Sequence, residues 1–197
     1  MQRKTFLASL NCDGSMLAAL LGCLTLLVTL YLGGSAVTAA LRFERAAIGQ
    51  GEWWRLISAH WVHLDARHLL VNCAGLCLLW ILYARELRPA HWLLVAGCAT
   101  AAIDAGLWWL DPLLQWYVGL SGLLHGAWAA GALRQALRPG RLGWVMVALL
   151  ALKLLLEQRS GASLVVSGLP VVTVAHLYGA LGGLAALAAL ALARKPL

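Results

Sequence analysis

Six long apolar runs separated by short polar connections constrain the fold of this chain more than any other feature. The runs lie near residues 16–40, 68–84, 91–110, 118–137, 142–157 and 171–193. Hydrophobic residues make up 62% of the chain and charged residues only 12%, against roughly 45–50% and 25% in soluble domains. So few charges cannot cover a water-facing surface, and about 20 apolar residues suffice to cross a bilayer. We therefore expect an all-α membrane protein, with residues 1–197 forming one compact domain of six transmembrane helices and no appended soluble domain.

The charges between the runs predict the orientation of the helices. Nine of the fifteen basic residues fall at run ends on one side of the expected bundle: Arg3, Lys4, Arg85, Arg88, Arg134, Arg138, Arg141, Arg194 and Lys195. Most acids fall on the opposite side: Glu44, Glu52, Asp65, Asp111 and Glu157. Since basic residues accumulate at cytoplasmic helix ends, we expect both termini in the cytoplasm. The same bias explains the net charge of +7, so no nucleic-acid partner is expected.

The first apolar run could instead belong to a signal peptide, because Arg3 and Lys4 precede it. The run is long for that purpose, and no convincing cleavage site follows it. We therefore interpret it as a transmembrane helix.

The connection from about residue 41 to 67 is long and amphipathic. It places Trp53, Trp54 and Trp61 among charged residues, with Arg55 directly after the tryptophan pair. Tryptophan rings favour the headgroup level, where one end of the side chain stays apolar and the other meets water. We expect short interfacial helices that lie partly in the outer leaflet.

Four polar side chains fall at one depth on three different runs. His68 and Asn72 are four residues apart and share one face of the second helix. Ser121 and His176 lie near the outer ends of the fourth and sixth helices. Polar residues within transmembrane helices are costly and commonly functional. We therefore expect these four residues to form a single site.

Glycine spacing indicates how two of these helices meet. Gly122 and Gly126 are four apart on the fourth run, as are Gly179 and Gly183 on the sixth, and such spacing allows close helix approach in lipid. Close approach permits a hydrogen bond between Ser121 and His176. A histidine base activates a serine hydroxyl as a nucleophile.

The remaining members of such a site follow from the same placement. His68, Asn72 and the backbone N–H of Ser121 could donate to a developing oxyanion. No acid is evident as a third member, so we expect a Ser–His dyad, because burying a carboxylate is costly.

Structural roles are predicted for the other polar residues. We expect His60 to be interfacial and His63 to make a structural hydrogen bond under the first loop. Asp104 is expected to pair with a loop arginine or an amide, and Lys153 with Glu157 as a solvated i,i+4 pair.

The five cysteines show no metal-ligand spacing: Cys12, Cys23, Cys73, Cys77 and Cys98. We expect them to be buried, reduced and structural, since a free cysteine packs like a small apolar side chain.

Several motifs together resemble the rhomboid family of intramembrane serine proteases. They are EWWR at residues 52–55, the histidines and asparagine at 63, 68 and 72, GLSG at 119–122, and AHLYGALGG at 175–183. The resemblance implies Ser121 as nucleophile, His176 as general base, and His68 and Asn72 as oxyanion stabilisers. It assigns supporting roles to Trp54, Arg55, Gly119, Gly122, Gly179 and Gly183, and it implies no metal or other cofactor.

One departure from the family pattern points to a particular branch. Rhomboids often carry an aromatic residue four positions after the serine, whereas this chain has His125. Together with the short chain of six expected helices and the motif GLSGLLHG at residues 119–126, this departure makes the chain most similar to the rhombosortase branch. That resemblance implies a multi-pass protein of the bacterial inner membrane with its active site facing the periplasm. Its substrates would be exported proteins held in the lipid by a single C-terminal anchor with a Gly-Gly element.

His125 is a fifth candidate residue of this site. It lies one helical turn after Ser121, so we expect it just below the Ser121–His176 pair, stacked on or bonded to the His176 ring. The alternative is a structural histidine bonded to a backbone carbonyl.

Three other functions compete with proteolysis. A haem or metal protein could use His68, His125 and His176, but the glycines around the serine would then have no purpose, and no HExxH or carboxylate-rich ligand set occurs. A catalytically inactive rhomboid-like chaperone would not need both Ser121 and His176. A small transporter would need polar residues in the cytoplasmic halves of its helices, which are apolar here.

Overall fold

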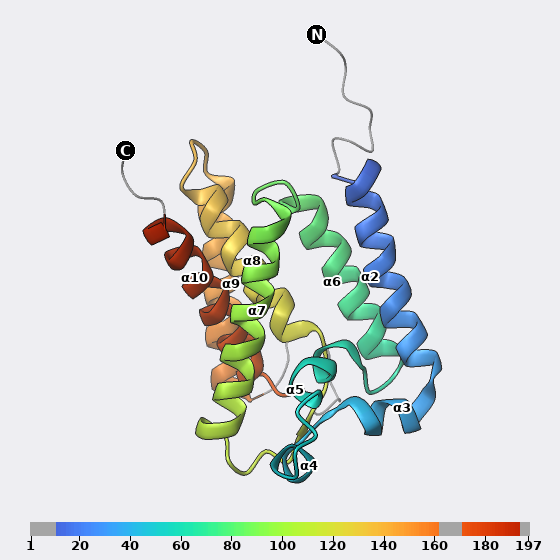
Figure 1. The fold of residues 1–197 in the computed structure, drawn as a ribbon. Helices are drawn as coiled ribbons and strands as arrows, with labels where there is room; N and C mark the ends of the chain where they lie inside the picture. The colour runs from blue at the N-terminus through green and yellow to red at the C-terminus, as the bar shows by residue number, and fades with distance from the viewer. Residues whose placement is uncertain (1–10, 162–170, 194–197) are drawn as a thin grey trace.

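The computed structural model describes residues 11–161 and 171–193 (Figure 1). Within these ranges, six helices of 16 to 20 residues form a bundle, with one of them extended by a π-helical segment. They are α2 (Gly14–Leu32), α6 (Ala66–Tyr83), α7 (Pro89–Ala105, continued by η2, Gly106–Leu110), α8 (Ser121–Ala136), α9 (Leu142–Ser160) and α10 (Val174–Ala193). The last five of these helices begin and end within about three residues of the predicted runs. The all-α prediction is confirmed.

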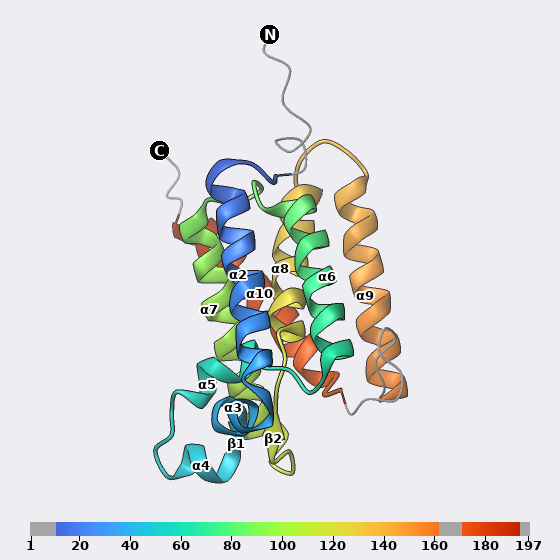
Figure 2. The same ribbon diagram turned by 90° about the vertical axis from the view of Figure 1, so that its right-hand side faces the viewer.

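The first run was predicted wrongly at its C-terminal end. The helix expected over 16–40 stops at Leu32, and a separate helix α3 (Gly34–Leu41) follows. Gly34 has a φ of +73°, which residues other than glycine rarely adopt. Figures 1 and 2 show α3 turned away from α2 and lying across the end of the bundle.

The first loop forms the short helices that its composition predicted. It contains β1 (Phe43–Glu44), α4 (Arg45–Gly49), α5 (Arg55–Ser58) and the 3-10 helix η1 (Ala59–Trp61). Phe43 and Glu44 pair antiparallel with Tyr117 and Trp116 of β2 (Trp116–Tyr117). This two-stranded sheet, which the sequence pattern did not predict, ties the first loop to the segment that leads into α8.

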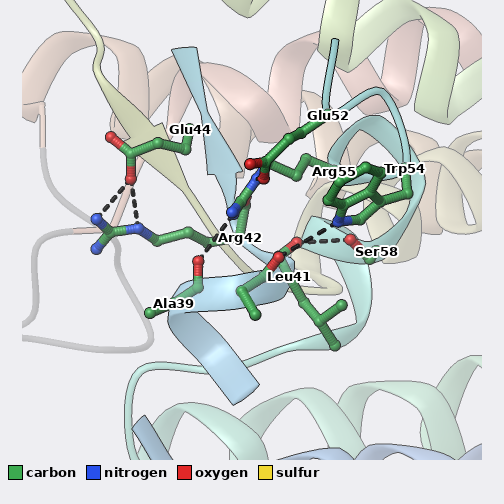
Figure 3. Close-up of polar contacts among 9 residues, drawn as sticks. Ala39, Leu41, Arg42, Glu44, Glu52, Trp54, Arg55 and Ser58 are labelled. Atoms are coloured by element: carbon green, nitrogen blue, oxygen red, sulfur yellow. Dashed lines mark hydrogen bonds and ion pairs between the residues drawn. The ribbon is translucent and has the colours of Figure 1, made fainter. Parts of the chain in front are cut away.

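Arg55 holds the first loop against α3. Its guanidinium forms a 2.6 Å ion pair with Glu52 and donates to the carbonyls of Ala39 and Arg42 at 2.8 and 3.0 Å (Figure 3). Arg55 is itself buried, whereas the Trp54 side chain is exposed and donates only a long bond to Ala40. The tryptophan–arginine motif therefore stabilises the structure of the first loop.

The glycine prediction is confirmed at the contact between α8 and α10, which pack closely together. A Cβ atom placed on Gly179 would overlap the carbonyl oxygen of Gly122, and one on Gly183 would overlap that of Gly126. Because only glycine fits at these positions, the two backbones approach to contact. This approach brings the N-terminal turns of α8 and α10 side by side.

Among the described residues, four helices are long and apolar enough to cross a membrane: α2, α6, α7 with η2, and α10. The crossing of all six helices and the cytoplasmic placement of both termini stay predictions. Arg3, Lys4, Arg194 and Lys195, which support that topology, lie outside the described residues.

All five cysteines are free, as predicted, but each is partly exposed rather than buried. Four of them, at positions 23, 73, 77 and 98, lie in helices apolar enough to cross a membrane. Partial exposure of a small apolar side chain to lipid costs little there, so burial was the wrong expectation.

Candidate active site

Ser121 is the first residue of α8. Gly119, two residues earlier, has a φ of +125°, and a Cβ there would lie 2.8 Å from the His68 ring. Glycine is therefore required both for the backbone angle and for the space beside His68. As the first residue of the helix, Ser121 has a backbone N–H with no partner inside the helix. The hydroxyl and this N–H are thus presented together.

His176 faces Ser121 from the first turn of α10. Its Nε2 lies 2.9 Å from the Ser121 hydroxyl oxygen, and its ring is almost fully buried. The structure thus brings together the two residues that the sequence analysis paired. This is the geometry in which a histidine base can take a proton from a serine hydroxyl.

The opposite ring nitrogen of His176 meets an acid that the sequence analysis assigned elsewhere. Its Nδ1 lies 2.8 Å from Oε2 of Glu157 on α9, and the other carboxylate oxygen lies 2.6 Å from the Lys153 ammonium. The predicted Lys153–Glu157 pair exists, but Glu157 has an exposed fraction of 0%. The expectations of a solvated pair and of a site lacking an acid are both wrong.

The carboxylate settles the tautomer of His176. An ionised carboxylate only accepts hydrogen bonds, so Nδ1 of His176 carries the ring proton. Nε2 is then the acceptor and the Ser121 hydroxyl the donor. The unprotonated nitrogen therefore faces the hydroxyl, as a general base requires.

His125 stacks on His176 one turn below Ser121. The ring centroids are 4.1 Å apart and the ring planes differ by 11°. Its Nδ1 donates a 2.7 Å bond to the carbonyl of Ser121, since a carbonyl oxygen only accepts. Both placements considered for this residue, stacking on His176 and bonding to a backbone carbonyl, therefore occur together.

His68 and Asn72 are buried on the same face of α6. Asn72 donates from its amide to the His68 carbonyl at 2.9 Å, which leaves its second N–H for another acceptor. Nδ1 of His68 accepts a long bond from the Leu64 N–H, so its proton resides on Nε2, on the side of Gly119. Both residues can donate toward the space beside Ser121.

A cavity of about 390 Å³ joins these side chains. It lies between α6, α8 and α9. Both α6 and α9 pack against α8, but they barely contact one another, and this leaves a space between them. The polar members of its lining are His68, Asn72, Ser121, His125, Lys153 and His176, and the other lining residues are mainly aliphatic. The four site residues predicted to lie together thus share one space, with apolar walls that suit a lipid-embedded segment.

Residues of the first loop and of β2 hold the turn before Ser121 in place. The Gly119 N–H donates to the Ala59 carbonyl at 3.0 Å, and the Tyr117 hydroxyl donates to the Gly119 carbonyl at 2.8 Å. The His60 ring meets the edge of the Tyr117 ring, with centroids 5.6 Å apart. Burial raises the pKa of the Tyr117 hydroxyl, which keeps it a donor.

His60 and Asp104 differ from their predicted placements. His60 is fully buried rather than interfacial, and its Nε2 lies 3.3 Å from the Asp104 carboxylate. Asp104 therefore faces this histidine instead of an arginine or an amide. The η1 helix turns His60 inward, which residue type alone could not reveal.

His63 is buried, and its ring meets the His68 ring edge-on, with the two centroids 5.0 Å apart. The structural hydrogen bond predicted for it is not found, because neither ring nitrogen has a partner among the described residues. Burial, aided by the nearby His68, lowers the pKa of His63 to about 4. His63 is therefore neutral at physiological pH and adds no charge beside His68.

The geometry of the site does not suit a bound metal ion. His125, Glu157 and His176 bring ligand-type atoms within 4.8 Å of one another. However, imidazole lone pairs lie in the ring planes, and the planes of His125 and His176 are stacked nearly parallel. One ion cannot lie in both planes, and Lys153 already binds the carboxylate. The arrangement fits hydrogen bonding and stacking around a histidine base better than a coordination shell.

Comparisons with known proteins agree with the motifs. The family model described as "Rhomboid domain" matches residues 50–193. The chain is also similar to the Bacillus subtilis (strain 168) protein named "Putative rhomboid protease YdcA", with 29% identity over 140 residues. That similarity covers 69% of this chain and 66% of the relative, so the chain spans just under two thirds of the relative's length.

Proposed function

The chain belongs to the rhomboid family, and we propose that it is an intramembrane serine endopeptidase with Ser121 as nucleophile and His176 as general base. The observation that carries this proposal is the 2.9 Å contact between the Ser121 hydroxyl and Nε2 of a buried histidine. Isolated serines and histidines are common in helices, but this pairing across two helices joined by glycine contacts is specific. The name of the Bacillus subtilis relative supports the same reaction class.

The proposed reaction begins when the Ser121 oxygen attacks the scissile carbonyl carbon and its proton moves to Nε2 of His176. The carbonyl π electrons move onto the oxygen and form a tetrahedral oxyanion. His176 then passes the proton to the leaving amine as the C–N bond breaks, which leaves an ester on Ser121. A water molecule attacks this ester while His176 takes one of its protons, and the return of that proton to Ser121 releases the acid product.

Three donors would stabilise the oxyanion. They are the Ser121 N–H at the start of α8, the second amide N–H of Asn72, and Nε2–H of His68. Preorganised donors stabilise the charge that develops in the transition state without reorganising, which makes them effective in a water-poor cavity.

The cavity and the resemblance to the rhombosortase branch support a proposal for the substrate class. We propose single-span exported proteins with a C-terminal anchor of the Gly-Gly type, cut near the outer, periplasmic face of the bacterial inner membrane. A helical substrate must unwind before its carbonyl can be attacked, and glycine lowers the helix stability that opposes this by about 1 kcal/mol per residue. The aliphatic lining of the cavity suits the apolar residues that follow such an element.

Reconstitution tests this proposal directly. The purified protein is placed in liposomes with a reporter whose single anchor begins with Gly-Gly, and cleavage is followed by gel and mass spectrometry. We expect the wild type to release the ectodomain and the Ser121→Ala and His176→Ala variants to accumulate in the membrane without cutting. Replacing the reporter glycines by leucine should block release. Proteolysis by Ser121→Ala would exclude the mechanism, and undiminished cutting of the leucine reporter would exclude the specificity.

A further inference from the structure

We propose that Glu157 is a positioning residue that completes a Ser121–His176–Glu157 triad, and that Lys153 holds Glu157 in place. The inference rests on the proposed function of Ser121 and His176 and adds two residues from α9 to that site. It replaces the dyad that the sequence led us to expect.

The contacts of the carboxylate carry the inference. Its two oxygens have separate partners: Oε2 accepts from Nδ1–H of His176 at 2.8 Å, and Oε1 accepts from Lys153 at 2.6 Å. The line from Ser121 through His176 to Glu157 therefore consists of two short hydrogen bonds between three helices, of which the one to Glu157 is buried. A third group that fixes the angle and tautomer of the base is common at sites with a serine nucleophile.

Helix stability alone does not explain an acid at this position. Glu157 lies three residues before the end of α9 at Ser160, where the helix dipole disfavours negative charge. The order of the pair, with lysine N-terminal to glutamate, is also the weaker of the two i,i+4 arrangements. Complete burial adds a desolvation cost that a surface pair would avoid. The position is costly for the fold, and the contact with His176 supplies a reason for it.

The carboxylate has a defined task in the reaction. When the Ser121 proton moves to Nε2, His176 becomes an imidazolium with Nδ1–H still bonded to Glu157. The carboxylate remains ionised and places a negative charge beside this positive ring, while the oxyanion on the substrate is the second negative charge. Lys153 supplies the matching positive charge, so the transition state contains two paired sets of opposite charges. No proton passes to Glu157 at any step.

Lys153 links the triad to the cavity. Its side chain is 15% exposed and forms part of the cavity lining, one turn below Glu157. Without this ammonium, the carboxylate would be buried with its charge only partly compensated, and it would be held by one fewer hydrogen bond. Lys153 therefore acts through Glu157 and need not touch the substrate.

Several groups that can carry charge surround His176 and must be considered in a pH experiment. They are His125 on α8, Glu157 and Lys153 on α9, and His68 on α6, whose ring lines the same cavity. A change specific to Glu157 must therefore be separated from changes caused by the other three.

A set of variants in liposomes tests the inference. It comprises Glu157→Gln, Glu157→Asp, Lys153→Met and the double variant Lys153→Met/Glu157→Gln, each assayed for kcat, KM and the pH dependence of the rate. Glu86→Gln is the matched control. Glu86 is also a mostly buried acid, and it forms an ion pair with Arg138. It follows the end of α6 that is opposite His68. Ser121→Ala defines the background.

We expect Glu157→Gln to lower kcat by about 10²- to 10⁴-fold with little change in KM, and Glu157→Asp to restore part of the loss. The acidic limb of the rate–pH profile should move to lower pH in Glu157→Gln, because the imidazolium loses its negative neighbour. The same pH profile measured for His68→Gln and His125→Tyr shows how much the His68 and His125 rings contribute to the position of the acidic limb. Glu86→Gln should match the wild type in rate and in pH profile.

The double variant separates positioning from packing. It removes both charges, so no unpaired charge remains buried, and a merely structural pair predicts that activity recovers toward the wild-type value. The triad predicts that activity stays as low as in Glu157→Gln. Recovery in the double variant, or an unchanged pH profile and kcat in Glu157→Gln, would overturn the inference while leaving Ser121 and His176 in place. Wild-type activity no higher than Ser121→Ala would instead overturn the proposed function.

Discussion

The ring of His125 lies almost parallel to the ring of His176, with the two centroids 4.1 Å apart. The same side chain bonds to the carbonyl of Ser121 through Nδ1. His125 therefore contacts both members of the proposed nucleophile–base pair, one through its face and the other through its edge.

Replacing His125 tests whether this stack supports the base. In His125→Ala the His176 ring loses a flat neighbour and gains freedom to tilt away from Ser121, so we expect a strong decrease in kcat. His125→Tyr keeps a ring at this position and should retain a good part of the activity. Full activity in His125→Ala, with an unchanged rate–pH profile, would leave His125 only a structural role.

The two α6 donors provide a second prediction. Removing one preorganised oxyanion donor typically lowers turnover by about 10²–10³-fold. We expect His68→Ala and Asn72→Ala each to decrease kcat by this order while changing KM little, measured on the anchored reporter in liposomes. Near-wild-type rates in both variants would mean that backbone N–H groups alone stabilise the oxyanion.

The contact between α8 and α10 gives a prediction about stability. Alanine at Gly183 would place a Cβ against the Gly126 carbonyl, and overpacking of this kind typically costs about 1–3 kcal/mol. We expect Gly183→Ala to lower the unfolding temperature in detergent and to reduce activity by separating Ser121 from His176. Gly97→Ala is the matched control, because a Cβ at Gly97 in the middle of α7 meets no atom within 4 Å. That variant should be as stable as the wild type or slightly more so, and equal effects of both substitutions would contradict the close approach.

The sequence predicted the parts of the site whose spacing has a direct geometric meaning. Glycines four residues apart predicted the meeting of α8 and α10, and the positions of Ser121 and His176 near the outer ends of their helices predicted their contact. The one-turn spacing of Ser121 and His125 likewise placed His125 below the pair. These are relationships within a single helix turn or at a single depth.

The rotation of α9 about its axis could not be predicted in the same way. The α9 segment is apolar along most of its length, so the periodicity that separates inner and outer helix faces in soluble proteins is weak there. Glu157 was therefore assigned to a solvated pair with Lys153. A signal was present, because an ionisable residue in such a run is costly and Glu157 lies at the depth of Ser121 and His176. The fold of the first loop, which buries His60, depends on tertiary contacts such as the β1–β2 pair.

Labelling with a serine-directed fluorophosphonate probe tests the central claim most directly. The probe reacts with a serine hydroxyl only when a neighbouring base activates it, and mass spectrometry locates the modified residue. We predict a single adduct on Ser121 in the wild type, none in Ser121→Ala, and much slower labelling in His176→Ala. An adduct on a different residue, or equal labelling rates in the wild type and His176→Ala, would contradict the assignment of Ser121 as a nucleophile activated by His176.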